Sequence, residues 1–330
     1  MRFGVIGTNF ITDRFINAGR LIPEFELVAV GSRTAERGKQ FSEKHSIPYV
    51  FTDFEKMAES GLIDAVYVAT PNYSHCEISR LFLAHGVHVL CEKPFAINEK
   101  EVVSMIEAAR ENNVKIMEAS RSIYMPEIQA IKNNLHRIGQ TRRAILQMSR
   151  YSSRYDLYLQ GKPTNTFDVS LGNGAIMDMG VYNIQLAVFL FGYPNSITAT
   201  GTILEDGKGI DGLCTTILQY DGFECVCMTS KVHTTHLYSE IAGQSRSILF
   251  TTSGELKDLK FYDNQGNAES IPSDGMGLEQ NIYYELKKFI QYVEEDDAAF
   301  GKRLETQELS VIRILDETRR QIGLRFPNDL

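Results

Sequence analysis

Short apolar runs alternate with amphipathic segments over the first 120 residues, and this alternation most constrains the fold. Because each run has the length of a strand and each segment has helical spacing, the pattern predicts βαβ crossovers and a doubly wound parallel sheet of the Rossmann type. We therefore expect an α/β protein whose first domain spans residues 1–122. The expected strands are 2–7, 27–32, 49–51, 64–70, 87–91 and 114–120, and the clearest expected helices are 34–45, 73–85 and 99–112.

The pattern changes after Pro126, where turn signals begin to separate short strand candidates. Turns such as Asp206-Gly207 and Asp221-Gly222 indicate a mostly antiparallel, open-faced sheet of about six strands. This sheet belongs to a second, α+β domain that is expected at residues 123–330. The other expected elements are a helix at 127–136, a strand at 143–151, and helices at 175–191, 277–294 and 305–322.

The composition argues against several classes of partner. The chain has 330 residues, of which 43% are hydrophobic, and a formal net charge of −8, which is typical of a two-domain globular protein. No basic patch stands out for nucleic acid or an anionic membrane, and no window approaches about 18 uncharged apolar residues. The N-terminus opens directly into a strand, so we expect a cytoplasmic protein that binds neither nucleic acid nor membranes. Five cysteines, at 76, 91, 214, 225 and 227, lack metal-ligand spacing and are expected to be reduced thiols without a metal.

The turn after the first strand is a candidate phosphate site of a dinucleotide-binding domain. It aligns with the pattern G-x-G-x-x-G with Gly7 first, Asn9 second and Thr12 third, so the pattern is degenerate. Asn9 tolerates positive φ, and its side chain either obstructs close backbone approach or hydrogen-bonds the pyrophosphate. The helix that begins near Phe10 offers N–H groups and a positive dipole end, so the βαβ context favours a cofactor site over an ordinary turn. The expected contacts are Gly7, Thr8, Asn9, Phe10 and Ile11.

The end of the second strand predicts the choice of nicotinamide cofactor. An NAD-selective site commonly has an acidic residue there, whereas this chain has Ser32 and Arg33. A hydroxyl followed by a guanidinium group suits the 2′-phosphate of NADP through charge-assisted hydrogen bonds. A solvated Arg33 at the head of a helix is the alternative. We therefore expect NADP as the preferred cofactor and NAD as the other candidate.

The triplet Glu92-Lys93-Pro94 places a cation at the end of a strand of the first domain. Ligands of doubly wound sheets bind beyond the carboxyl ends of the strands, so Lys93 is expected to point at the cofactor and the substrate. Pro94 fixes φ and stiffens the backbone that carries the lysine. A surface lysine in a strand-to-helix loop is the alternative.

The expected helix at 175–191 carries a candidate proton-transfer pair. Asp178 and Tyr182 are four residues apart, so they lie on one face of a helix. A phenol is a poor base at neutral pH, but an adjacent ammonium group such as that of Lys93 stabilises the phenolate. Without the first domain, Asp178 would be interpreted as a solvated acid and Tyr182 as a packing residue.

Five motifs, in this order, resemble the glucose-fructose oxidoreductase and inositol dehydrogenase family of nicotinamide-dependent enzymes, and the resemblance spans nearly the whole chain. The Met117-Glu118-Ala119 triplet, and Tyr182 in place of a histidine, look most like the dihydrodiol dehydrogenase and sugar-oxidoreductase branch rather than the inositol branch. The motifs are FGVIGTNFI (3–11), ATPNYSH (69–75), CEKP (91–94), MEASRSIYMP (117–126) and GAIMDMGVY (174–182).

The resemblance implies a role for most of the candidate residues. It implies that Lys93 and Tyr182 are the catalytic pair and that Asp178 lies beside the substrate. It also implies a C-terminal domain whose open sheet face pairs with another subunit. The strands at 213–220 and 223–231, with apolar residues on both faces, agree with a homo-oligomer, either a dimer or a tetramer. The residues that the resemblance places at the nicotinamide and its ribose are Thr70, Pro71, Asn72, His75 and Glu92.

These observations predict an NAD(P)-dependent oxidoreductase that moves a hydride between nicotinamide and a carbinol or carbonyl carbon of a sugar, polyol or vicinal diol. Tyr182 is expected to be the general acid and base, Lys93 its support, and Asp178 the residue that orients a substrate hydroxyl. Two alternatives stay open: a non-catalytic NAD(P)-sensing regulatory protein with the same fold, and a redox enzyme on a nucleotide-sugar or imine substrate. Further substrate candidates, each also explained as a structural residue, are Arg121, Tyr124 and Arg154.

Overall fold

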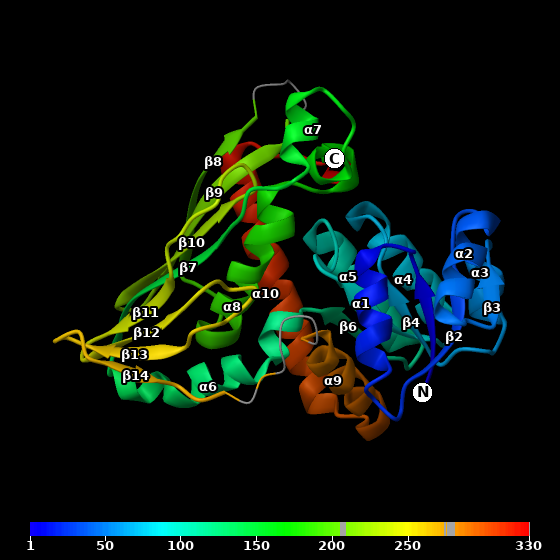
Figure 1. Cartoon of the computed structure of the whole chain (residues 1–330), viewed down its shortest axis with the longest axis horizontal. Helices are drawn as coiled ribbons and strands as arrows, with labels where there is room; N and C mark the ends of the chain where they lie inside the picture. Colours follow the sequence, from blue (N-terminus) through cyan, green and yellow to red (C-terminus); the bar gives the residue numbers. More distant parts are fainter. Residues whose placement is uncertain (205–208, 274, 276–280, 330) are drawn as a thin grey trace. The chain divides into compact units, whose positions relative to one another are not determined.

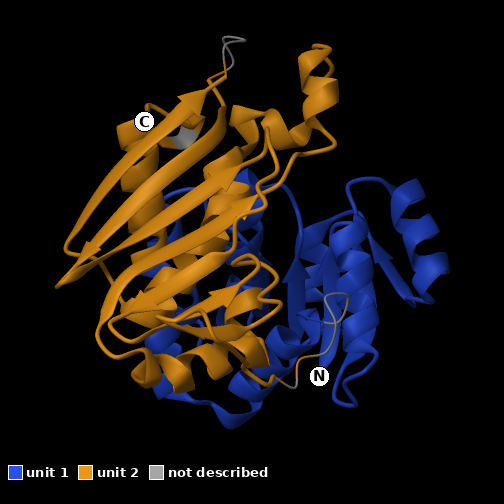
Figure 2. Ribbon diagram, turned by 60° about the vertical axis from the view of Figure 1, so that its left-hand side comes forward, with its two compact units in different colours: residues 1–121, 276–309 blue, residues 122–275, 310–330 orange. Residues whose placement is uncertain are grey.

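The computed structural model of the chain describes residues 1–204, 209–273, 275 and 281–329. The chain forms two compact units, which Figure 2 distinguishes by colour. Unit 1 contains Met1–Arg121 and Met276–Leu309, and unit 2 contains Ser122–Gly275 and Ser310–Leu330. The boundary expected after residue 122 lies next to the first division, but a single cut misses the return of the C-terminal segment to unit 1.

Unit 1 is built on a parallel sheet with the strand order β3-β2-β1-β4-β5-β6 (Figure 1). The chain begins in the middle of the sheet and winds outward in both directions, which confirms the predicted doubly wound Rossmann arrangement. Its central strands are fully buried, and this explains why they are continuous apolar runs rather than alternating ones. The strands are β1 (Arg2–Ile6), β2 (Glu26–Gly31), β3 (Tyr49–Phe51), β4 (Ala65–Val68), β5 (His88–Glu92) and β6 (Ile116–Ala119).

Polar N-caps fix where several helices of unit 1 begin. The side chains of Asn9, Thr34, Asp53 and Asn98 each accept a hydrogen bond from the first turn of the helix that follows. The helix expected at 34–45 therefore begins one residue later, after its cap. The helices are α1 (Phe10–Gly19), α2 (Ala35–His45), α3 (Phe54–Glu59), α4 (His75–Ala84), α5 (Glu99–Glu111) and α9 (Ile282–Glu295), which packs against α1.

Unit 2 contains a mixed sheet with the order β14-β13-β12-β11-β7-β10-β9-β8. Its pairs are antiparallel except that β10 runs parallel to β7, so the predicted mostly antiparallel sheet is confirmed. The predicted turn Asp221-Gly222 joins β9 to β10, whereas Asp206-Gly207 lies outside the described residues. The strands are β7 (Thr141–Ser149), β8 (Ser196–Ile203), β9 (Asp211–Tyr220), β10 (Phe223–Ser230), β11 (Ser239–Gly243), β12 (Arg246–Phe250), β13 (Lys260–Asp263) and β14 (Ala268–Ser270).

The helix expected at 175–191 is divided. It starts with a π turn (Ile176–Gly180) and continues as α8 (Val181–Phe191), which packs against β7 and β10. The segment Val169–Phe191 is long and apolar enough to cross a membrane by length and composition alone, but 72% of it is buried, as in the core helix of a globular unit. Other helices are α6 (Pro126–Asn134), α7 (Tyr155–Leu159) and α10 (Ala298–Ile322), whose first part belongs to unit 1.

One face of the unit 2 sheet carries an apolar row. Figures 1 and 2 show the helices of unit 2 on the opposite side of the strands. Cross-strand pairing aligns three apolar side chains on β9, β10 and β7, and the line continues through Glu240 on β11 to a fourth apolar side chain on β12; each of the four apolar side chains keeps part of its surface exposed. These residues, called the outer row below, are Ile217, Val226, Ile145 and Leu249.

Candidate active site

The turn between β1 and α1 requires a glycine at its first position. Gly7 has φ +109°, and a Cβ atom built there would lie 2.4 Å from the carbonyl oxygen of Ala69. Any larger residue would therefore push β1 away from the end of β4. Gly7 thus allows the backbone to turn sharply at the carboxyl edge of the sheet, where doubly wound folds bind their ligands.

Asn9 caps α1 instead of pointing into an open phosphate site. Its Oδ1 accepts hydrogen bonds from the N–H groups of Ile11, at 3.0 Å, and Thr12, at 3.3 Å. Its Nδ2 donates to the carbonyl oxygen of Ala69 at 2.9 Å. The amide of Asn9 therefore holds the turn together, and its expected contact with the pyrophosphate stays a prediction. This cap therefore accepts hydrogen bonds from two of the helical N–H groups that were expected to face an anion.

The next residue, Phe10, is 73% exposed. A large aromatic side chain at the carboxyl edge of a Rossmann sheet has a surface available for a planar ligand group. The structure therefore leaves Phe10 accessible for the cofactor contact expected from the sequence.

The part of the site that is expected to bind adenosine contains more basic residues than were predicted from the sequence. Ser32 is buried at the end of β2, and Arg33 is exposed beside it. A cavity of about 320 Å³ adjoins Thr8 and the first turns of α2. Its lining residues are Thr8, Arg37, Gln40, Phe41 and Lys44, of which only Thr8 was expected. Arg37 lies on α2, four residues after Arg33 along the chain, a spacing that could have indicated a second cation.

The turn that follows β4 is a compact hydrogen-bonded structure. Ser74 Oγ donates to Thr70 Oγ1 and to the carbonyl oxygen of Pro71, both at 2.8 Å. Thr70, Pro71 and Asn72, the residues expected at the nicotinamide, all keep part of their surface exposed. They form one continuous segment at the carboxyl edge of unit 1.

His75 differs from its neighbours in this segment because it is fully buried. Its Nδ1 lies 2.9 Å from the carbonyl oxygen of Pro94, and its Nε2 lies 2.9 Å from the carbonyl oxygen of Thr70. Burial lowers the pKa of His75, while the two carbonyl groups oppose this effect and Lys93 adds to it. The ring therefore contacts backbone on both sides, in place of the expected contact with a ligand.

Lys93 follows β5 and is partly buried beside a cluster of acids. Both oxygens of Glu92 are engaged within the chain: Oε1 accepts from the Tyr67 hydroxyl, and Oε2 accepts from the N–H of Lys93 at 3.2 Å. Burial raises the pKa of Glu92, while Tyr67, Lys93 and Arg121 lower it. The structure thus directs Glu92 toward Tyr67, which the sequence analysis did not single out.

A second buried carboxyl, that of Glu285, belongs to the same cluster in unit 1. Burial raises the pKa of Glu285 well above its usual range, and the charge of Glu92 raises it further. Arg121 and Arg14 act in the opposite direction on Glu285. Arg121, a substrate candidate from the sequence, therefore lowers the pKa of both Glu92 and Glu285 and stabilises the charged form of these buried acids.

In unit 2, the π turn and α8 carry the predicted pair Asp178 and Tyr182. Asp178 Oδ2 accepts a hydrogen bond from Nζ of Lys231, whose side chain is 6% exposed, whereas that of Asp178 is 35% exposed. Lys231 therefore places a buried cation against a carboxylate that is partly exposed. Tyr182 is 5% exposed, and its ring packs near Gly254. The sequence analysis missed Lys231, which is 53 residues from its partner along the chain.

The start of the π turn is held by a buried carboxyl. Asp211 Oδ2 accepts the N–H of Ile176 at 2.8 Å, and a Cβ atom added at Gly174 would meet Asp211 Oδ1 at 1.9 Å. Burial raises the pKa of Asp211 to about 6, although hydrogen bonds from the backbone N–H groups of Ile176 and Ala175 and the charge of Lys231 lower it. Asp211 and Gly174 thus place the turn that carries Asp178.

The remaining candidates are placed separately. Tyr124 is partly buried in unit 2, whereas Arg154 is exposed in the polar segment that precedes α7. Among the described residues, three possible metal ligands of unit 1 approach one another, all of them exposed: Glu55, Glu59 and His85. The cysteines are free thiols, and Cys91, Cys214, Cys225 and Cys227 are buried.

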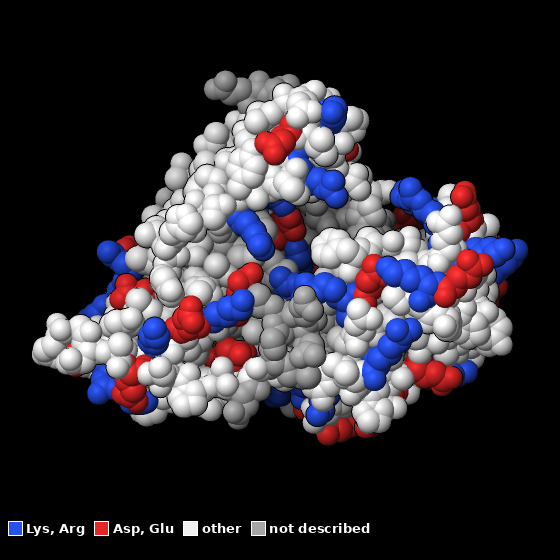
Figure 3. Space-filling model, viewed as in Figure 1, with Lys and Arg blue, Asp and Glu red and all other residues white. Residues whose placement is uncertain are grey.

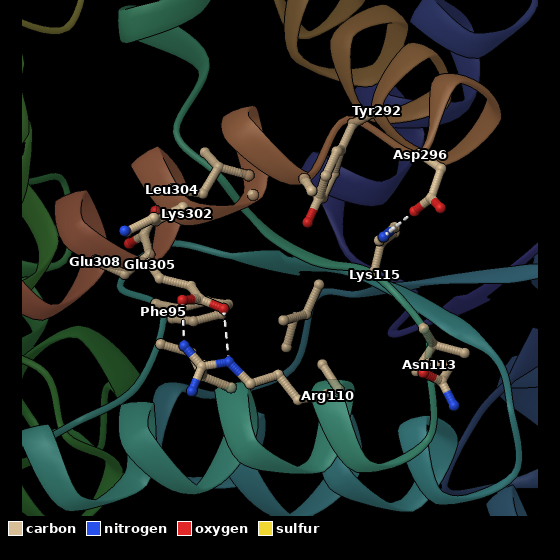
Figure 4. A pocket seen from close by; sticks show the side chains of 16 residues that line it. Phe95, Arg110, Asn113, Lys115, Tyr292, Asp296, Lys302, Leu304, Glu305 and Glu308 are labelled. Atoms are coloured by element: carbon tan, nitrogen blue, oxygen red, sulfur yellow. Dashed lines mark hydrogen bonds and ion pairs between the residues drawn. The ribbon is translucent and has the colours of Figure 1, made fainter.

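A larger cavity, of about 510 Å³, lies within unit 1 between α5, β6, α9 and the first part of α10 (Figure 4). Ion pairs between Arg110 and Glu305 and between Lys115 and Asp296 lie on its walls. None of the residues predicted for the site lines it, although Phe95, two residues after Lys93, is part of its wall.

Known protein families match both parts of the chain. The oxidoreductase family with an NAD-binding Rossmann fold matches residues 1–120, and the GFO/IDH/MocA C-terminal domain matches residues 133–255.

Curated relatives match over the full length. The scyllo-inositol 2-dehydrogenase (NADP(+)) IolU of Bacillus subtilis (strain 168) is 41% identical, covering 100% of this chain and 99% of the relative. The trans-1,2-dihydrobenzene-1,2-diol dehydrogenase of Sus scrofa is 27% identical, covering 100% and 99%. Proteins named for inositol and for dihydrodiol substrates are thus both among the relatives.

Solved structures share the fold. An NAD binding oxidoreductase from Klebsiella pneumoniae has a TM-score of 0.85 at 20% identity and covers 98% of this chain and 97% of that one. The 3-ketoreductase KijD10 from Actinomadura kijaniata, in complex with TDP-benzene and NADP, has a TM-score of 0.83 at 21% identity, with coverage of 99% and 98%. These similarities confirm the predicted combination of a Rossmann domain and a C-terminal α+β domain.

Proposed function

The chain belongs to the GFO/IDH/MocA family of oxidoreductases, and we propose that it uses NADP to oxidise or reduce one carbon of a polyol or vicinal diol. The observation that carries the substrate class is the Asp178–Lys231 pair in unit 2, next to Tyr182 on the same helical segment. A carboxylate that is held by a buried cation and is partly exposed can accept hydrogen bonds from the hydroxyl groups of a substrate.

The residues of unit 1 fit a phosphorylated nicotinamide dinucleotide. The cavity beside Thr8 is lined by the cations Arg37 and Lys44. Ser32 and Arg33 follow β2, at the place where an NAD-selective site commonly has an acidic residue. This donor set suits a phosphate monoester better than a bare ribose diol. The relative IolU is named as NADP-dependent, which agrees with this preference.

Tyr182 is the group that we propose exchanges a proton with the substrate. For oxidation, the phenolate oxygen of Tyr182 takes the proton of the carbinol hydroxyl and becomes a phenol, while the carbon loses a hydride and the carbonyl forms. When bound, NADP accepts that hydride at its nicotinamide ring. In the reverse direction Tyr182 returns the proton to the carbonyl oxygen. Lys93 supports the reaction because an ammonium group stabilises both a phenolate and a developing alkoxide.

Asp178 is proposed to select substrates that carry a second hydroxyl next to the reacting carbon. A partly buried carboxylate that hydrogen-bonds a substrate hydroxyl group disfavours analogues that lack this hydroxyl, because they leave its polar atoms without that partner. This role favours polyols and vicinal diols over simple alcohols. The names of the inositol and dihydrodiol relatives agree with this substrate class.

Two further features of the protein are part of the proposal. We infer a homo-oligomer through the outer row of unit 2, because the adjacent apolar residues Ile217, Val226 and Ile145, with Leu249 beyond Glu240, form a surface that a second copy can cover. We also infer a cytoplasmic enzyme, since its free thiols suit a reducing compartment. On the face in Figure 3, basic and acidic side chains are interspersed, which suits a small-molecule enzyme better than a polyanion-binding protein.

The experiment that tests this function is a turnover screen with both cofactors. Inositol isomers, cyclic and linear vicinal diols, aldoses and matched mono-alcohols are each incubated with NADP or NAD, and nicotinamide absorbance is followed. We expect turnover with at least one polyol or diol, faster with NADP, and little with the mono-alcohols. Binding of NADP without turnover of any member would instead support the sensing protein, and activity confined to nucleotide-sugars or imines would support the other alternative.

A further inference from the structure

The loop that carries Lys93 is held from two sides by buried polar side chains of unit 1. On one side, the ring of His75 contacts the carbonyl oxygen of Pro94. On the other, Glu118 accepts the N–H of Phe95 at 2.7 Å. Because both contacts fall within two residues of Lys93, they determine where its backbone lies.

His75 differs from Glu118 because it also reaches a second functional segment. Its Nδ1 and Nε2 are each 2.9 Å from a backbone carbonyl oxygen, that of Pro94 on one side and that of Thr70 on the other. Thr70 begins the turn proposed to bind nicotinamide. We propose that His75 is a positioning residue that couples this turn to the Lys93 loop. The inference rests on the proposed roles of Thr70 and Lys93.

Because of the chemistry of imidazole, His75 can donate a hydrogen bond to only one of the two segments at a time. Carbonyl oxygens only accept hydrogen bonds, and a neutral ring has a single N–H to donate. A neutral His75 therefore holds either the Lys93 loop, with the proton on Nδ1, or the cofactor turn, with the proton on Nε2. Movement of one segment away from the ring favours the tautomer that binds the other.

The opposite side of the loop has a fixed partner. Glu118 is 1% exposed, and its second oxygen accepts a hydrogen bond from the Ser120 hydroxyl. Glu308 lies against Glu118, and burial together with this neighbour raises the pKa of Glu308 well above its usual range. A protonated Glu308 can donate to Glu118, so Glu118 remains the acceptor for Phe95. Figure 4 shows Phe95 and Glu308 on the wall of the same cavity.

Two substitutions separate the two contacts of His75. In His75→Asn the amide nitrogen can occupy the position of Nδ1 and donate to Pro94, but it does not reach Thr70. In His75→Gln the longer side chain places the amide nitrogen near the position of Nε2, so that it serves Thr70 and not Pro94. His75→Leu removes both donors, and His85→Gln, at an exposed histidine of the same unit, is the matched control.

The first measurement is amide hydrogen exchange of the ligand-free chain, in segments 69–74 and 91–97. We expect His75→Gln to accelerate exchange mainly in 91–97, His75→Asn mainly in 69–74, and His75→Leu in both. The second measurement compares the NADP dissociation constant with kcat. His75→Gln should lower kcat by about 3- to 10-fold with NADP affinity nearly retained, and His75→Asn should weaken NADP binding by a similar factor, the worth of one hydrogen bond.

Equal effects of the Asn and Gln variants on both segments, or no effect of either, would overturn the proposal and leave His75 as a packing residue. The exchange measurement needs neither cofactor nor substrate. If the wild type shows no NADP-dependent turnover, the proposed function fails while the exchange pattern still decides the role of His75.

Discussion

We propose that cofactor choice depends on individual cations at the end of β2 and the start of α2. Arg33 follows the buried Ser32, and Arg37 lines the neighbouring cavity beside Thr8. A guanidinium group recognises a phosphate monoester through charge-assisted hydrogen bonds, which a free ribose hydroxyl cannot match. The contribution of each arginine can therefore be measured as the difference between NADP and NAD binding.

Replacement of Arg33 by Ala should weaken NADP binding by about 1.5 to 3 kcal/mol, the worth of a hydrogen bond to a charged group, and change NAD binding little. Arg37→Ala should act in the same direction, and Lys39→Ala, an exposed cation on the same helix, is the control. Calorimetric or fluorescence titration with both cofactors measures these effects. An equal loss for both cofactors, or tighter binding of NAD than of NADP by the wild type, would contradict the assignment.

Sequence alone could identify site residues that follow a local rule. Lys93 and Ser32 were predicted because each one follows a strand of a parallel sheet, whereas Thr70 was implied by the family resemblance. Tyr67, Glu285 and Lys231 were missed because their partners are distant along the chain, and burial of the pair is not visible in a local pattern. The contact between the Asn9 amide and the carbonyl of Ala69 was not predicted for a related reason, because it joins two residues that are 60 positions apart.

At the scale of elements, the π turn decides where Asp178 lies relative to Tyr182. The sequence analysis assumed the 3.6-residue period of one continuous helix over 175–191, whereas the wider first turn shifts that relation. Asp211 and Gly174, which hold this turn, are at positions about which helical periodicity gives no information. π turns of this kind often occur at functional sites, which agrees with the residues found here.

The carboxyl of Asp211 should make the stability of the protein depend on pH. Its pKa is about 6 in the folded protein, above the ordinary value of 3.8, so the folded state binds the proton more tightly. Its stabilising contribution is therefore complete below about pH 4 and is lost as the pH rises through about 6. From pH 4 to pH 7, the free energy of unfolding of the wild type should fall by up to about 3 kcal/mol relative to Asp211→Asn.

Urea denaturation of both proteins at several pH values measures this difference. The sign is distinctive, since a carboxyl with a lowered pKa would give the opposite slope between these pH values. Parallel stability curves for the wild type and Asp211→Asn would show that the carboxyl is not held as the structure indicates.

At the scale of the whole molecule, two features could not be predicted from periodicity. Residues 276–309 belong to unit 1, far along the chain from the rest of that unit. A division of the chain at a single point assigns them to the second domain. The parallel pairing of β10 with β7 is also non-local, because 73 residues or more separate the two strands. By contrast, the parallel sheet of unit 1 was predictable because each crossover is short and repeats one local pattern.

The partly exposed apolar residues on the open face of the unit 2 sheet predict that copies of the chain associate with one another. Val226→Glu places a charge within the outer row, where its burial against a second copy is unfavourable, so the variant should be monomeric at micromolar concentration. Leu159→Glu, at a 64% exposed position on α7, is the control and should keep the wild-type mass. Light scattering with size-exclusion chromatography measures both. A monomeric wild type would refute an oligomer that uses this face.

We propose that Tyr182 exchanges the substrate proton and that Lys93 supports this transfer. The most direct measurement is kcat for Tyr182→Phe, Lys93→Met and the double variant on a polyol or diol that the wild type turns over. Tyr182→Phe should lower turnover by about 100-fold to 10,000-fold, the usual worth of a positioned acid or base. Lys93→Met should also lower it, and the double variant should be little worse than the more damaging single change. Near-normal turnover in Tyr182→Phe, with folding and NADP binding intact, would contradict the account.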